Sequence, residues 1–106
     1  MHKEKFIQHS GLASQLMAQG RYDAAVDEYK AALRYAPADP VTYSRLGAAY
    51  AKAGMINLAL DFLYQGSLLY LHTGDRTKAL QVADKMKEID RESRYTRKIF
   101  QELQTV

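Results

Sequence analysis

The sequence predicts an all-α fold of about six helices that pack as antiparallel pairs. Apolar residues recur every three or four positions, which is the spacing of an amphipathic helix. Gly20, Gly54, Gly74 and both prolines fall between these runs, where helices are expected to end. The chain also repeats itself with a period of about 34 residues, as stacked helical repeats do. We therefore expect one domain over residues 1–106.

The internal repeat appears when the chain is aligned with itself after a shift of one such period. Small residues then fall on small residues, and large apolar residues fall on large apolar ones. The paired positions are Leu12 with Leu46, Ala13 with Gly47, Leu16 with Tyr50, Gly20 with Gly54, Tyr22 with Ile56, Ala25 with Ala59, Tyr29 with Leu63, and Ala32 with Gly66.

The first repeat is expected over residues 6–39 and contains two helices. Leu12 and Leu16 lie four apart in the first helix, and Gly20 ends it as a C-terminal cap. The second helix begins near Tyr22 and ends at Pro37. Its apolar residues recur at helical spacing, so it presents one continuous face to the core.

The second repeat is expected over residues 40–73, with Gly54 between its helices. A third glycine signal, Gly74 with Asp75, follows Gly54 after much less than a full period. The helix at 56–72 is therefore expected to close the second repeat and open a degenerate third one, which a helix at 75–90 completes. A capping helix at 92–104 follows, since the end of a helical stack needs a polar outer face.

Two segments resemble the tetratricopeptide-repeat (TPR) family. They are Leu-Ala-Ser-Gln-Leu-Met-Ala-Gln-Gly-Arg-Tyr-Asp-Ala-Ala at 12–25 and Leu-Gly-Ala-Ala-Tyr-Ala-Lys-Ala-Gly at 46–54, and Pro37 stands where a repeat of this family usually ends. The resemblance covers about residues 6–91. It implies a right-handed α-solenoid whose concave groove holds an extended peptide or a helix.

The resemblance implies a groove lined by the first helix of each pair, with short apolar side chains and two cations. Arg45 could form a forked hydrogen bond with a carboxylate. The expected groove residues are Ser10, Ser14, Met17, Arg45, Ala48, Lys52, Tyr64, Gln65 and Leu68.

One subfamily grips the C-terminal carboxylate of chaperone tails with lysine and asparagine. The corresponding positions here hold Ser10, Ser14, Arg45, Asp61 and Gln65, so we expect no binding of that kind.

Residue types argue against an enzyme, a metal site and a cofactor. The chain has no cysteine, which excludes disulfides, zinc-thiolate sites and cysteine nucleophiles and is compatible with a cytoplasmic protein. His2, His9 and His72 do not have the spacing of metal ligands, and no phosphate-binding glycine loop is present. Apolar runs are shorter than a signal peptide or a membrane span needs. We expect no catalytic residues, no metal and no cofactor.

Charge is unevenly distributed along the chain. Residues 1–75 hold seven basic and seven acidic side chains, whereas residues 76–106 hold eight basic and five acidic ones. Arg91, Arg94, Arg97 and Lys98 recur at helical spacing, so an anionic partner could bind there. Interleaved acids weaken that field and argue against nucleic acid as a partner.

The function that these observations favour is a protein-binding adaptor or scaffold that holds a peptide or helix in its concave groove. Two alternatives remain open at this point. One is an anionic partner, nucleic acid or an acidic protein, on the basic C-terminal helix. The other is self-association of the solenoid ends into a homo-oligomer.

Overall fold

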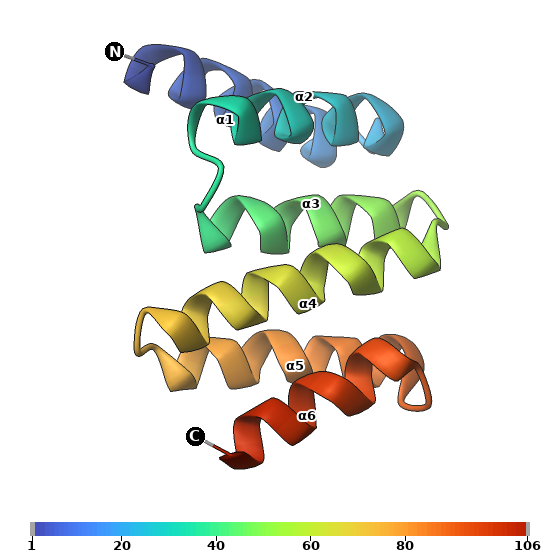
Figure 1. The fold of residues 1–106 in the computed structure, drawn as a ribbon. Coiled ribbons are helices and arrows are strands. Elements are labelled where there is room, and N and C mark those ends of the chain that lie inside the picture. Colours follow the sequence, from blue (N-terminus) through green and yellow to red (C-terminus); the bar gives the residue numbers. More distant parts are fainter. Residues whose placement is uncertain (1, 106) are drawn as a thin grey trace.

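The computed structural model describes residues 2–105, and within this range all regular secondary structure is helical. Six helices follow one another along the stack shown in Figure 1, with the two termini at opposite ends. They are α1 (Lys3–Ala18), α2 (Tyr22–Tyr35), α3 (Pro40–Lys52), α4 (Ile56–His72), α5 (Arg76–Asp90) and α6 (Arg94–Thr105). The expectation of an all-helical solenoid of about six helices is confirmed.

Each helix packs mainly on its neighbours in the chain, as in other solenoids. The exception is α6, which contacts α4 as well as α5. The molecule measures 37 × 31 × 17 Å, and its short dimension corresponds to two layers of helices about 10 Å apart. In Figure 1, α1 lies behind α2 and α5 lies behind α6.

Three of the five connections are glycine turns of one type. Gly20, Gly54 and Gly74 have φ angles of 75°, 84° and 86°, a left-handed conformation that is strained for other residues. In each turn the N–H of the next residue donates to a carbonyl one helical turn before the glycine, which caps the preceding helix. These bonds are Arg21 to Leu16 at 2.9 Å, Met55 to Tyr50 at 2.9 Å and Asp75 to Tyr70 at 2.8 Å. The connections α1–α2, α3–α4 and α4–α5 are therefore equivalent.

The other two connections have no glycine and use side chains to begin the next helix. Asp39 precedes α3, and its Oδ2 accepts a hydrogen bond of 3.1 Å from the N–H of Thr42. Ser93 precedes α6, and its Oγ accepts a hydrogen bond of 3.2 Å from the N–H of Tyr95. Both side chains satisfy N–H groups that a helix N-terminus leaves free.

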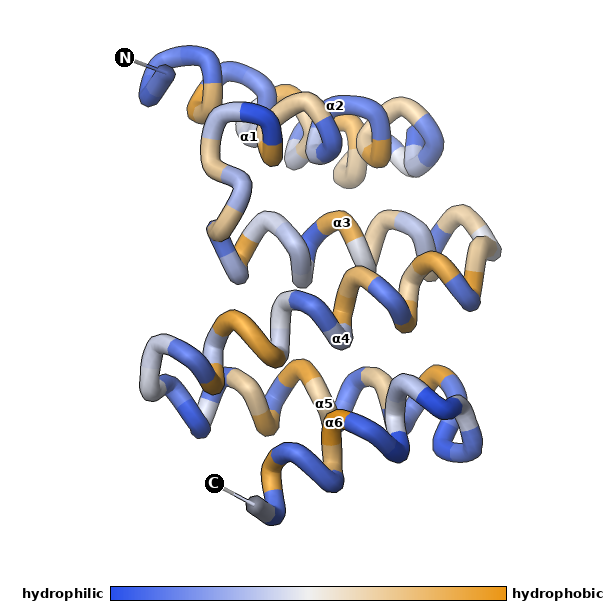
Figure 2. The backbone as a smooth tube through the Cα atoms, viewed as in Figure 1, coloured by the Kyte–Doolittle hydropathy of each residue, from blue (hydrophilic) through white to orange (hydrophobic). Residues whose placement is uncertain are grey.

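The core consists of two clusters of buried residues that meet in α4. Ala59 belongs to the N-terminal cluster and Leu60 to the C-terminal one, so α4 is shared. Figure 2 shows α4 as more hydrophobic than α6, which matches this central position. The N-terminal cluster is Ala13, Val26, Tyr29, Leu46, Ala49, Tyr50 and Ala59, and the C-terminal cluster is Leu60, Leu63, Tyr70, Ala79, Val82, Ala83, Met86, Ile99 and Leu103.

Candidate functional site

A hollow of about 530 Å³ lies between α3 and α5, with α4 at its floor. It forms because α3 and α5 pack on the same side of α4, which contacts both of them. Arg45 projects from α3 at its rim, and Tyr70 of α4 lies below. The lining residues are Val41, Ser44, Arg45, Tyr70, Lys78, Gln81, Val82, Asp84, Lys85 and Glu88.

The same groove continues toward the C-terminal end of α3 as a more apolar hollow of about 660 Å³. Lys85 and Glu88 line both hollows, so the two are continuous along α5. Short side chains on α3 leave the space open. This second part is lined by Ala48, Ala51, Lys52, Ile56, Leu63, Lys85, Glu88 and Ile89.

Cations outnumber carboxylates along this α3–α5 groove. Four basic side chains line it, against the carboxylates of Asp84 and Glu88. Among the residues that the structure describes, none of the four lies within 4.0 Å of a carboxylate oxygen. Each therefore keeps its hydrogen-bond donors available for a ligand. The four cations are Arg45, Lys52, Lys78 and Lys85.

Two phenols respond to the charge of Arg45. Burial raises the pKa of Tyr70, and the carboxylates of Asp39 and Asp75 raise it further, while Arg45 opposes the rise. Burial also raises the pKa of Tyr29, and Arg45 again opposes the rise. Lys78 adds a second positive charge, because its Nζ lies 5.9 Å from the centroid of the Tyr70 ring. This end of the groove thus places two cations, Arg45 and Lys78, beside an aromatic floor.

The structure brings three of the expected groove residues together and places the other six elsewhere. Arg45, Ala48 and Lys52 line the α3–α5 groove. The three expected residues of α1 line neither part of it. Ser14 is exposed, Met17 packs on the N-terminal cluster, and the buried Oγ of Ser10 has no hydrogen-bond partner within residues 2–105.

The three expected residues of α4 also lie outside the two hollows. The ring of Tyr64 meets that of Tyr95 on α6, with centroids 5.8 Å apart, and Leu68 packs on the C-terminal cluster. Gln65 donates a 3.0 Å hydrogen bond to Asp61 one turn earlier. The periodicity of apolar residues in the sequence predicts that these three residues lie on one helix. It does not predict which neighbouring helix packs on each side of α4.

Sequence reasoning missed the contribution of α5 to the groove. Lys78, Gln81 and Lys85 were not among the expected residues, because the groove is expected along the first helix of each pair and the helix at 75–90 is expected as the second helix of the third repeat. A signal for the helix, though not for its individual residues, was present. In an antiparallel stack, every second helix lies on the same side, so the helices after Pro40 and after Asp75 should share a face.

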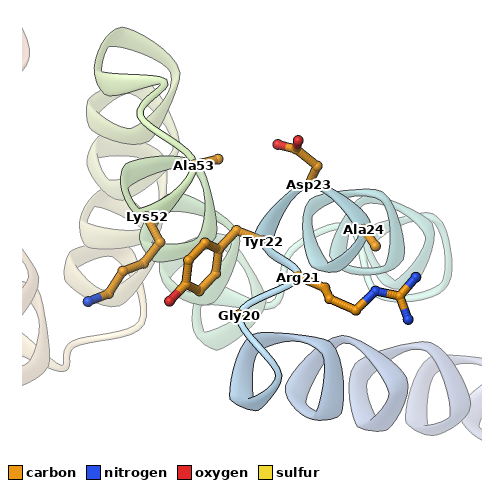
Figure 3. Close-up of a pocket in the computed structure, with 7 residues that line it drawn as sticks. All are labelled: Gly20, Arg21, Tyr22, Asp23, Ala24, Lys52 and Ala53. Carbon is orange, nitrogen blue, oxygen red and sulfur yellow. The ribbon is translucent and has the colours of Figure 1, made fainter.

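Lys52 also lies at a third hollow, of about 460 Å³, where the α1–α2 turn meets the end of α3. Figure 3 shows its side chain beside the ring of Tyr22, with Arg21 and Asp23 directed elsewhere. This hollow is lined by Gly20, Arg21, Tyr22, Asp23, Ala24, Lys52 and Ala53.

The four C-terminal cations are exposed, and three of them contact other side chains. Arg97 forms an ion pair with Glu92. The guanidinium of Arg94 lies 5.2 Å from the centroid of the Tyr95 ring, and Lys98 Nζ lies 5.6 Å from that of Tyr64. Arg91 occupies the position directly after the last residue of α5.

Neither a metal cluster nor a membrane helix occurs in the part of the chain that the structure describes. Over residues 2–105, no three side chains of His, Asp or Glu gather closely enough to hold a metal ion. None of the helices in that range combines the length and apolar character needed to cross a bilayer.

Comparisons with known proteins show the same fold. Residues 13–54 match the sequence model of the TPR repeat. The crystal structure of the Sgt2 TPR domain from Aspergillus fumigatus is similar, with a TM-score of 0.54 at 20% identity, covering 95% of this chain and 78% of that one. The first TPR of Spaghetti (RPAP3), bound to the HSP90 peptide SRMEEVD, gives a TM-score of 0.56 at 19% identity, covering 94% of each chain. No curated protein matches the sequence.

Proposed function

Since residues 13–54 carry the tetratricopeptide repeat, and the described chain has the fold of a tetratricopeptide-repeat domain, we propose that this protein is a non-enzymatic adaptor. Domains of this kind mediate protein–protein interactions. Its ligand is a peptide or helix of a partner protein, held in the α3–α5 groove. We place the adaptor in the cytoplasm, in line with the absence of cysteine.

The observation that supports this proposal most is the set of unpaired cations along an open, partly apolar groove. Charge-assisted hydrogen bonds from Arg45 and Lys78 suit a carboxylate of the ligand. The apolar part around Ile56, Leu63 and Ile89 suits a large apolar side chain of the same ligand. Short residues such as Ala48 leave room for the ligand backbone.

The groove that we propose differs from the one expected from the sequence, because α5 takes the place of α1, and α4 contributes Ile56, Leu63 and Tyr70 in place of the expected Tyr64, Gln65 and Leu68. We propose that repeats at 6–39 and 40–73, the overlapping third repeat and the capping helix at 92–104 form one domain around it. The equivalence of the three glycine turns supports this division.

The test is capture of a partner protein from a native lysate by the wild type and by the double variant Arg45→Ala/Lys52→Ala. Each lost charge-assisted hydrogen bond costs about 1.5–3 kcal/mol, so we expect affinity to fall at least about tenfold. Lys5→Ala/Arg34→Ala removes the same two residue types from exposed positions on α1 and α2 and should retain the partner. Equal capture by both variants would locate the binding surface outside the groove.

A further inference from the structure

Two tyrosines that are far apart in the sequence become neighbours on the face formed by α4 and α6. The rings of Tyr64 and Tyr95 have centroids 5.8 Å apart and are tilted by 47°. Both side chains are half-buried, so each ring packs inward on one side and keeps part of its surface open. The sequence alone shows neither this pairing nor its position beside the basic helix.

Cations flank the tyrosine pair on both sides. Lys98 Nζ lies 5.6 Å from the centroid of Tyr64, and the Arg94 guanidinium lies 5.2 Å from that of Tyr95. Neither cation lies within 4.0 Å of a carboxylate oxygen in the described part of the chain. A ring contact leaves the N–H donors of these groups free to bind an anion.

Within the part of the chain that the structure describes, cations outnumber acids on α6. Its exposed residues are three cations, two glutamines and a threonine, while its one acid, Glu102, is half-buried. Glutamine amides offer both donors and acceptors for hydrogen bonds. The exposed residues are Arg94, Arg97, Lys98, Gln101, Gln104 and Thr105.

Three carboxylates near this face are engaged in local hydrogen bonds or an ion pair. Asp90 accepts a 3.0 Å hydrogen bond from the N–H of Glu92, and Glu92 pairs with Arg97. Asp61 on α4 accepts the 3.0 Å bond from Gln65. A hollow of about 470 Å³ beside the tyrosine pair is lined by Asn57, Asp90, Ser93, Arg94 and Tyr95.

We propose that this α4–α6 face binds single-stranded nucleic acid. Phosphates bind along Arg94, Arg97 and Lys98, and a base stacks on the open part of the tyrosine pair. An acidic protein would use the cations but not the rings. A membrane surface would need exposed apolar side chains on α6. The apolar residues Ile99 and Leu103 of this helix are instead buried, together with Thr96.

The direct test is fluorescence anisotropy with a labelled oligothymidylate of about 12 nucleotides, a length within the usual site size. With about three phosphates bound, the logarithm of the association constant should fall with the logarithm of the salt concentration with a slope near −2. The affinity should therefore drop roughly tenfold to twentyfold between 50 and 200 mM salt. A duplex of the same length should bind more weakly, because its bases cannot stack on the tyrosines.

Matched variants locate the site. Arg94→Gln/Lys98→Gln should weaken binding of the oligothymidylate at least about tenfold, whereas Lys5→Gln/Arg34→Gln, with the same change in charge, should leave it within about twofold. Tyr95→Leu keeps an apolar side chain but removes the ring, and should cost about fivefold or more. Circular dichroism checks that each variant is folded.

Three outcomes overturn the proposal: no binding at about 50 mM salt, equal losses in both charge variants, or a duplex that binds as tightly as the single strand. Displacement of the oligothymidylate by polyglutamate at equal charge concentration would instead assign the face to acidic proteins. These results are independent of the α3–α5 groove, since the two surfaces share no residue.

Discussion

Gly47 lies where α3 packs closely on α4. A Cβ added there would lie 2.7 Å from Cγ of Leu63 and 3.1 Å from the carbonyl oxygen of Ala59. The Leu63 side chain could rotate away, but the backbone oxygen cannot move without displacing α4. Gly11 is the opposite case. It lies in the middle of α1, and an added Cβ would have no neighbouring atom within 4 Å.

We predict that the substitution of alanine at these two glycines changes the free energy of unfolding in opposite directions. Gly47→Ala should lower the free energy of unfolding by about 1–3 kcal/mol through overpacking. Gly11→Ala should raise it by about 0.5–1 kcal/mol, because alanine restricts the unfolded chain and favours the helix. Urea unfolding followed by circular dichroism measures both. A stable Gly47→Ala protein would show that α3 and α4 are not in close contact.

Leu12 shows what a repeat alignment leaves undetermined. It aligns with Leu46, yet Leu12 is 43% exposed and Leu46 is fully buried. Both occupy the same position in the repeat, but Leu46 faces helices on two sides, whereas Leu12 lies on α1, the first helix of the stack. Position within the repeat predicts the helix face, and the neighbours decide the burial.

At the scale of the helices, the fold class and the helix count could be predicted because periodicity and the glycine positions are local signals. The groove could be predicted only in part. Arg45, Ala48 and Lys52 follow from their position on α3, but the groove needs α5 opposite them. Which face α5 presents depends on how two helices pack across α4, and no local pattern encodes that.

The equivalence of the three glycine turns leads to a prediction at this scale. Gly20→Ala, Gly54→Ala and Gly74→Ala should each cost a similar amount, about 1–2 kcal/mol, because each forces alanine into a left-handed conformation with open space around the side chain. Thermal and urea unfolding of the three variants tests this. A much smaller cost at Gly74 would mean that the α4–α5 turn is not held like the other two.

The molecule as a whole has two core clusters joined by one shared helix. In a solenoid, each unit is stabilised by its neighbours, so damage in one cluster should act mainly on that half. Val26 in the N-terminal cluster and Val82 in the C-terminal cluster are 7% and 5% exposed, which makes them a matched pair.

We predict that Val26→Ala and Val82→Ala, each costing about 1–3 kcal/mol, have different effects on hydrogen exchange. Val26→Ala should increase amide exchange chiefly in α1 and α2, and Val82→Ala chiefly in α5 and α6. Native-state exchange measured by mass spectrometry distinguishes the two patterns. Uniform loss of protection in both variants would instead indicate a single cooperative unit.

The glycine turn at Gly74 bears on how such a chain can change in length. When every second connection between helices is of one type, the repeating unit is a pair of helices. Such a stack gains or loses helices two at a time. Here two consecutive connections, before and after α4, are of the same type. Duplication of one helix with its turn then fits the architecture as well as duplication of a pair. A stack with an odd number of helices then becomes possible. Because successive helices run in opposite directions, adding one helix places the C-terminus of the chain at the opposite edge of the stack.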